Sequence, residues 1–164
     1  MLKVNEKGFT LIEILVALAI AGAIMGVMAA AVITIIKTTS QNDEWNVNMR
    51  QVQNAGYWIS HDALMAQSVS TNTTGVFLDL SWSDWNNTGG TQYNNSIHYV
   101  LNGNTLTRSL NGGSAILIAQ YIVLPPTTTC QWDSNGGKLT VTIRASLHGK
   151  RYAQQTYQIS PRPM

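Results

Sequence analysis

The feature that most constrains this chain is an uninterrupted apolar run close to its N-terminus. From Ile14 to Ile36 the sequence reads ILVALAIAGAIMGVMAAAVITII and contains no charged residue. At about 1.5 Å per residue, a helix of this length extends roughly 35 Å, which is enough to cross a bilayer core of about 30 Å. The run is too long and too uniformly apolar for the core helix of a soluble domain. We therefore expect one membrane-spanning helix.

The remainder of the 164-residue chain has the composition of a small polar domain. Charged residues make up 11% of the chain and its net charge is +2, which argues against a polyphosphate-binding surface and against a charged disordered tail. The chain has one cysteine, Cys130, so an internal disulfide framework and a cysteine zinc cluster are excluded.

A cleaved secretory signal is the main alternative for the apolar run. Residues 29–31 are three alanines and could mimic its cleavage site, but the run continues to Ile36. The more informative junction precedes the run. A short leader with Lys3 and Lys7 ends at Gly8, and residues 7–13 read KGFTLIE.

This junction resembles the type IV prepilin signal, in which a basic leader ends in Gly before Phe, Thr-Leu-Ile-Glu and a long apolar helix. The resemblance implies that prepilin peptidase cleaves between Gly8 and Phe9 on the cytoplasmic side, and that the new amino group of Phe9 is methylated. It divides the chain into a cleaved leader (1–8), a transmembrane and assembly helix (9–37) and an extracytoplasmic pilin-like head (38–164).

Glu13 is the single charge between Lys7 and Lys37. A carboxylate in an apolar span costs on the order of 2–3 kcal/mol at mid-bilayer and less near an interface, so such a residue usually has a partner. Cleavage after Gly8 would create a cationic amine on Phe9, four residues away, with a reference pKa of about 8. Glu13 could contact the Phe9 amine of its own chain, whereas the family resemblance implies pairing with the amine of a neighbouring subunit. A tolerated interfacial glutamate is the remaining alternative.

The flanks of the run favour one orientation in the membrane. Lys3 and Lys7 precede the span and Lys37 follows it, a mild positive-inside bias that predicts a cytoplasmic N-terminus and an inner-membrane location. Gly22 and Gly26 form a Gly-x-x-x-Gly pair, which permits close approach of another helix and also softens this one.

The sequence after Lys37 predicts that the helix continues into the head. An apolar stripe repeats at intervals of four and three residues, as on one face of an amphipathic helix, and we expect the helix to end near Val69. The stripe comprises Trp45, Met49, Val52, Gly56, Ile59, Ala63 and Ala66, whose small members suit close packing.

Beyond this helix, alternating apolar residues predict strands, and the fold class is α+β: one long helix packed on a C-terminal antiparallel sheet. Residues 70–75 and 83–92 are expected to be loops, 102–104 (Asn-Gly-Asn) a hairpin turn, and 116–123 is ambiguous. The expected strands are 76–82, 96–101, 105–110, 138–147 and 151–159.

The head resembles the minor pseudopilins, above all the J type of type II secretion and the W-type minor pilins. The resemblance lies first in the helix, in residues 49–55 and in 58–63 followed by Ala66. It lies also in a hairpin pattern that runs from Tyr99 through Leu106 to Arg108. It implies a structural filament subunit with no catalytic residues and no cofactor. Its partners would be other pilin-like subunits, prepilin peptidase, an inner-membrane assembly platform and lipid.

Other chemistry in the head is weakly supported by the sequence. Adjacent helical residues such as His61 and Asp62 point about 100° apart and do not converge on one ion. The acidic residues Asp79, Asp84 and Asp133 lack the spacing of a calcium loop. No histidine lies close to Cys130 in the sequence, so a packed thiol is favoured over a nucleophile.

Positive charge near the C-terminus keeps a second function open. A minor type IV pilin whose head binds DNA or a surface is the alternative to a secretion pseudopilin, although such charges can equally be solvated strand residues. The residues concerned are Lys138, Arg144, Lys150, Arg151 and Arg162, with His148 among them.

Overall fold

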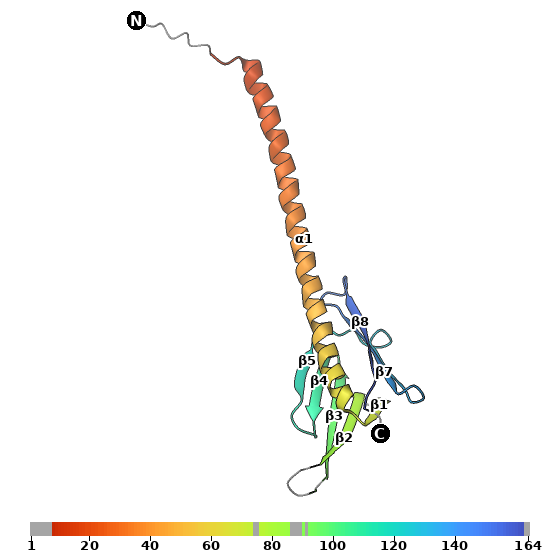
Figure 1. Cartoon of the computed structure of the whole chain (residues 1–164). Helices are drawn as coiled ribbons and strands as arrows, with labels where there is room; N and C mark the ends of the chain where they lie inside the picture. Colours follow the sequence, from red (N-terminus) through yellow and green to blue (C-terminus); the bar gives the residue numbers. More distant parts are fainter. Residues whose placement is uncertain (1–7, 74–75, 86–89, 91, 163–164) are drawn as a thin grey trace. The chain divides into compact units, whose positions relative to one another are not determined.

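A computed structural model of the chain describes residues 8–73, 76–85, 90 and 92–162. Most of the leader therefore lies outside the described residues, and so do residues 86–89 and 91 of the predicted loop at 83–92. Within the described residues, one long helix, α1 (Leu11–Met65), is followed by eight strands, and the predicted α+β class is confirmed (Figure 1). The chain divides into two compact units, one ending at Asn42 and one running from Asp43 to Met164.

The first unit is the N-terminal part of α1. The most apolar 18-residue window of this helix has a mean hydropathy of 2.5, and none of the window is buried by the rest of the chain. By length and composition, α1 is the one helix within the described segments that could cross a membrane.

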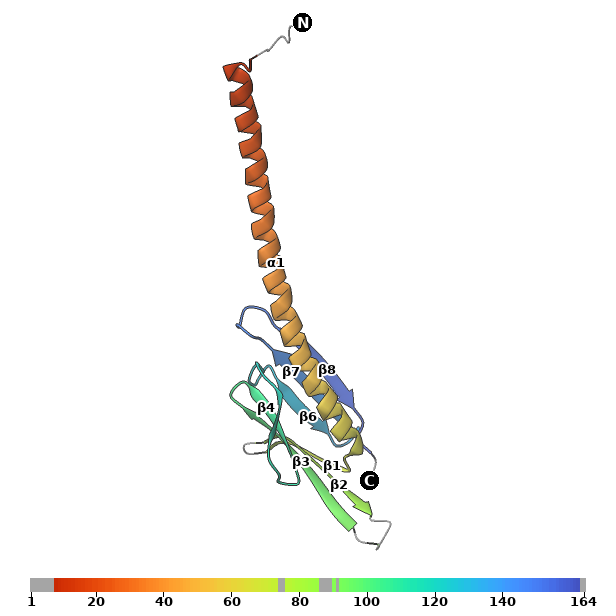
Figure 2. The same cartoon turned by 90° about the vertical axis from the view of Figure 1, so that its left-hand side faces the viewer.

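The second unit contains the remainder of α1 and two antiparallel sheets. The larger sheet follows chain order, β1-β2-β3-β4-β5, and the smaller one is β6-β7-β8. Both sheets flank the part of α1 that belongs to this unit (Figure 2). The strands are β1 (Ser68–Thr73), β2 (Val76–Trp85), β3 (Gln92–Asn102), β4 (Thr105–Leu110), β5 (Ile116–Ala119), β6 (Thr129–Asp133), β7 (Lys138–Ala145) and β8 (Ala153–Ile159).

The predicted hairpin is confirmed and the segments before it need correction. Asn102 pairs with Thr105, so Gly103 and Asn104 form a two-residue turn, and Gly103 has a positive φ of 56°. Residues predicted as a loop from 70 onward instead form most of β1, because their backbone pairs antiparallel with β2, with Ser70 opposite Asp79 and Thr71 opposite Leu78. β2 and β3 also extend three and four residues further than predicted, toward the loop that joins them.

The apolar stripe of the helix is confirmed over most of its length. Val52, Ile59, Ala63 and Ala66 are fully buried in one cluster with residues of both sheets, and Met49 packs against it. Trp45 was wrongly placed in the stripe: it is 44% exposed, because it lies before the first buried turn of the helix. The helix ends at Met65 rather than Val69, since Ser68 already pairs with β2.

Gly56 is needed for the close approach of α1 to β8. A Cβ atom at this position would overlap the ring of Tyr157. The ring has little freedom to move away, because the Tyr157 hydroxyl donates a hydrogen bond to the Val52 carbonyl at 3.2 Å. Overpacking of this kind typically costs about 1–3 kcal/mol.

Polar side chains of α1 bind the loops and the strand edge beside it. The buried Asn48 amide donates to the Arg151 carbonyl at 3.2 Å and accepts from the Leu147 N–H at 2.8 Å. Asn54 donates to the Ile118 carbonyl at 2.5 Å, on β5 at the edge of the larger sheet. These bonds satisfy backbone groups that an uncovered edge would leave available for aggregation.

The segment after β5 joins the two sheets. Ile122 forms an isolated antiparallel bridge with Ala145 of β7, and the Val123 N–H donates to the Arg144 carbonyl at 2.8 Å. The Ile122 N–H also donates to the Asn104 carbonyl in the hairpin turn. The ambiguous apolar segment 116–123 is therefore a short strand followed by this link, and β6 is a strand that the sequence pattern did not reveal.

Candidate functional site

The residues of the predicted cleavage junction precede α1. Gly8, Phe9 and Thr10 are exposed, and the Phe9 side chain is 83% exposed. A Cβ atom added to Gly8 would meet nothing within 4 Å. Packing among the described residues therefore does not require glycine at position 8. Recognition of Gly8 by another molecule would explain this residue instead.

Thr10 and Glu13 form a capping box at the start of α1. One carboxylate oxygen of Glu13, Oε2, accepts hydrogen bonds from the Thr10 N–H and from the Thr10 hydroxyl, each at 2.9 Å. In return, the Glu13 N–H points to the Thr10 hydroxyl oxygen at 3.4 Å. This reciprocal Thr-x-x-Glu arrangement satisfies donors that a helix N-terminus otherwise leaves unpaired. The Thr-x-x-Glu pattern is visible in residues 10–13 of the sequence, but the capping role of Thr10 and Glu13 was not predicted from it.

The helix surface around Glu13 is apolar and open. A shallow depression of about 430 Å³ is lined there by Phe9, Glu13, Ile14, Ala17, Leu18 and Ala21. Further along, Cβ atoms at Gly22 and Gly26 would meet nothing within 4 Å. Packing within the chain thus explains neither glycine, and both leave the helix surface low enough for another helix to approach.

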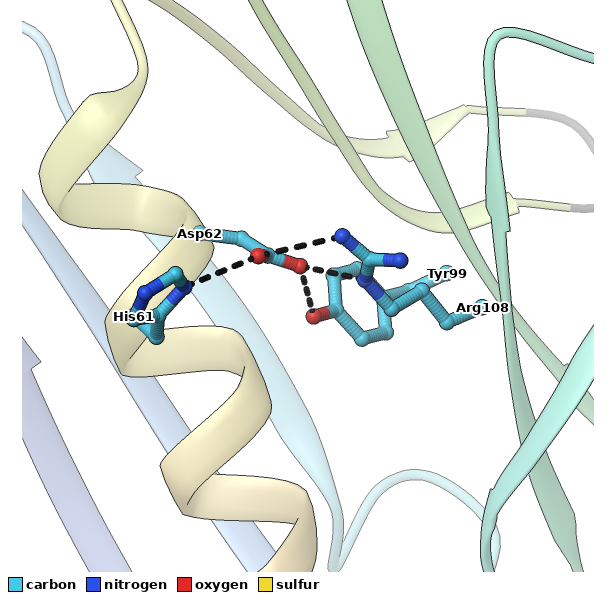
Figure 3. A network of polar contacts seen from close by, with 4 residues as sticks. All are labelled: His61, Asp62, Tyr99 and Arg108. Carbon is cyan, nitrogen blue, oxygen red and sulfur yellow. Dashed lines mark hydrogen bonds and ion pairs between the residues drawn. The ribbon is translucent and has the colours of Figure 1, made fainter.

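In the second unit, the carboxylate of Asp62 is the centre of a buried polar network. Its side chain is 1% exposed. Oδ2 accepts a hydrogen bond from the Tyr99 hydroxyl at 2.5 Å and one from Arg108 Nε at 2.6 Å, while Oδ1 accepts from a terminal nitrogen of Arg108 at 3.2 Å. Figure 3 shows Asp62 reaching from α1 toward Tyr99 and Arg108, with His61 on the other side of the carboxylate.

The charges of this network are matched. Burial, followed by the hydrogen bond to Asp62, raises the pKa of Tyr99 far above its usual value, so this phenol stays protonated and donates. The hydrogen bond to Asp62 raises the pKa of Arg108, which stays cationic. The Arg108 guanidinium also lies 5.1 Å from the centroid of the Trp58 ring, a cation–π contact with α1.

This network joins the two stretches of sequence that carried the head resemblance. Asp62 belongs to the helix stretch, whereas Tyr99 and Arg108 are directly paired across β3 and β4. The two-residue turn makes that strand pairing predictable. The contact to Asp62 was missed, and its signal is spacing: Asn48, Ala55 and Asp62 recur every seven residues and all three are buried.

His61 has a different environment from Asp62. Its side chain is 57% exposed, its Nδ1 lies 3.4 Å from Asp62 Oδ1, and its ring stacks on Tyr57. Across the described residues, no group of three or more His, Cys, Asp or Glu side chains is arranged to hold a metal ion.

The three acidic residues considered for calcium are engaged elsewhere. Asp79 contacts His98 on the neighbouring strand, Asp84 accepts from Trp82 Nε1 at 2.9 Å, and Asp133 accepts from the Asn135 N–H at 3.0 Å. Cys130 is buried, and burial raises the pKa of its thiol to about 12, so the nucleophilic thiolate is scarce at neutral pH.

The basic residues near the C-terminus do not form one patch. Lys138 begins β7 and Arg144 lies six residues further along it, about 20 Å away in an extended strand. The Arg144 guanidinium stacks on the Tyr152 ring at 3.4 Å, and His148 contacts Glu44 at 3.1 Å. Lys138 therefore lies apart from Arg144 along β7.

Comparison with known proteins identifies the N-terminal segment. Residues 3–33 match the family model described as the prokaryotic N-terminal methylation motif. This match covers the N-terminal segment alone and indicates that this segment is of the type IV pilin-like kind. Neither the search of curated proteins nor the search of solved structures found a match.

We expect Asp62→Asn to destabilise the second unit by about 3 kcal/mol or more, because it leaves the largely buried Arg108 without its counter-charge. Urea unfolding of the full chain in detergent micelles, followed by circular dichroism, measures this loss. The matched control is His61→Ala on the adjacent, exposed residue, which should cost less than about 0.5 kcal/mol. Equal midpoints for the two variants would contradict a structural role for the network.

Proposed function

We propose that this type IV pilin-like chain is a minor pseudopilin, a structural subunit of a type II secretion system or a related filament machine. The observation that carries the proposal is the N-terminal part of α1. It is apolar over a membrane's thickness and none of its apolar window is buried, and residues 3–33, which include most of this apolar run, match the methylation motif. Such a surface needs lipid before assembly and other pilin-like helices afterwards.

Maturation would occur at the Gly8–Phe9 bond. Prepilin peptidase would remove residues 1–8 at the cytoplasmic face of the inner membrane and leave Phe9 with a methylated, cationic amine. The exposure of both residues and the open space around Gly8 support access of a protease to this bond. The apolar helix would stay on the mature chain, with the head on the extracytoplasmic side.

Glu13 would then pair with the Phe9 amine of a neighbouring subunit. Thr10 occupies Oε2 of the carboxylate, whereas Oε1 has no hydrogen-bond partner among the described residues. The capping box survives cleavage, because Thr10 and Glu13 both remain on the mature chain. Glu13 can therefore cap its own helix and accept a bond from another subunit at the same time.

The J-type or W-type assignment of the head rests on the Asp62 network. The residues of that network come from both stretches of the head resemblance. Their contacts with one another are a structural reason for both stretches to occur in one chain. The assembly platform of the inner membrane and other minor pseudopilins are the partners that this assignment predicts. The separation of Lys138 from Arg144 gives no support to the DNA-binding alternative.

Deletion of the gene in its host tests the filament system. We expect loss of protein export into the medium, because a missing minor pseudopilin stops the secretion filament from forming. DNA uptake and surface motility should be unchanged. Loss of either of these with normal export would contradict the secretion role and favour a minor pilin.

We expect Glu13→Gln to preserve membrane insertion and to reduce incorporation into sheared filaments at least about tenfold, because the charge attraction across a low-dielectric interface is lost. Crosslinking to partner subunits gives a second readout.

Thr10→Ala is the matched control, because it removes the capping partner and leaves the Glu13 charge. This variant should assemble nearly as well as the wild type. An assembly defect of equal size in both variants would mean that Glu13 acts through the capping box and not through a partner subunit.

A further inference from the structure

The β2–β3 hairpin extends beyond the end of α1, and one of its faces has an unusual composition (Figures 1 and 2). Alternate residues of a strand point to the same face, so Ser81, Ser83 and Trp85 share one face of β2. The opposite face carries Leu78 and Leu80, which are buried in the core. We refer to the first side as the hairpin face.

Cross-strand pairing completes the hairpin face with uncharged partners. Ser96, Asn94 and Gln92 of β3 lie directly opposite those three β2 residues. All six side chains are exposed or half-buried, and none carries a charge. Trp85 is 67% exposed, more than any other large apolar residue described in the second unit.

A cavity opens beside this face where β1 begins. It has a volume of about 530 Å³ and is lined by Gln67, Ser68, Ser81, Trp82, Ser83 and Asn94. The volume is in the range of small-molecule sites. At this cavity the Ser83 N–H donates a hydrogen bond to the Gln67 side-chain oxygen, Oε1, at 3.0 Å.

The lining is held in place and still offers hydrogen-bonding groups. The Ser83 hydroxyl donates to Asn94 Oδ1 at 2.8 Å, and Trp82 Nε1 is fixed on Asp84 at 2.9 Å. With their oxygens engaged in this way, the Gln67 and Asn94 amides each present an NH₂ group that has no acceptor among the described residues. The Ser68 and Ser81 hydroxyls add groups that both donate and accept.

We propose that this cavity and the hairpin face bind a neutral oligosaccharide. Sugar hydroxyls both donate and accept hydrogen bonds, as serine and amide side chains do, and the apolar face of a pyranose ring stacks on an exposed indole such as Trp85. The absence of Lys and Arg from the lining disfavours nucleic acid and acidic polysaccharides. On the same face of β2 and β3, the nearest pair of ionisable residues is Asp79 and His98, which contact each other. This site goes beyond the filament role and does not depend on it.

Titration of the full chain with neutral hexasaccharides tests the proposal. The chain is kept in lauryldimethylamine oxide micelles, because a glycoside detergent would compete for the site. N-acetylchitohexaose, cellohexaose and maltohexaose are the probes, with polygalacturonate and a single-stranded DNA oligonucleotide as charged comparisons. We expect saturable heat of binding for at least one neutral hexasaccharide.

Two tryptophan variants locate the binding. Trp85→Ala should weaken it at least about tenfold, because a stacking ring is lost from the site. Trp45→Ala removes another exposed tryptophan, 44% exposed and on α1, and should leave the affinity unchanged. Both variants should unfold at the wild-type urea midpoint, since neither ring belongs to the core. The proposal is overturned if no neutral hexasaccharide saturates, if Trp85→Ala binds as tightly as the wild type, or if a charged polymer binds more tightly than every neutral probe.

Discussion

The constraint on which the rest of this molecule depends is an apolar helical surface that its own chain leaves uncovered. The residues of the buried core all lie in the unit from Asp43 to Met164, whereas the apolar window of α1 has no buried part. Exposed apolar area costs roughly 25 cal/mol per Å² in water, so this surface must be covered by lipid or by other helices. Polar groups are rare in such a segment for the same reason, and Glu13 is accommodated at its very start. There the Thr10 capping box provides two donors for the carboxylate.

The head is stabilised by a different principle, in which buried polar groups specify how α1 meets the sheets. Apolar stripes made of Gly and Ala pack closely but distinguish poorly between registers. The Asp62 carboxylate removes that ambiguity, because it must meet Tyr99 and Arg108 to offset its desolvation. Asn48 and Asn54 add fixed amide contacts along the same helix.

Much of this organisation could be predicted from the sequence, because it follows from local patterns. The apolar run, the junction at Gly8 and the turn at Gly103 each act over a few residues. The position of Trp45 was mistaken because periodicity gives the face of a helix but not the point at which the core begins. β1 was missed because serine and threonine are typical of loops as well as of edge strands. The seven-residue spacing of Asn48, Ala55 and Asp62 indicates that Asp62 faces the core, but its partners lie 37 and 46 positions away in the chain, and no local pattern identifies them.

The central claim is that the chain matures as a pilin-like subunit and keeps its apolar helix. The most direct test is the intact mass of the protein extracted from the membranes of a host with active prepilin peptidase. The account predicts the mass of the chain from Phe9 to Met164 plus one methyl group. A mass that still includes Met1, or one that begins after Ala31, would contradict it.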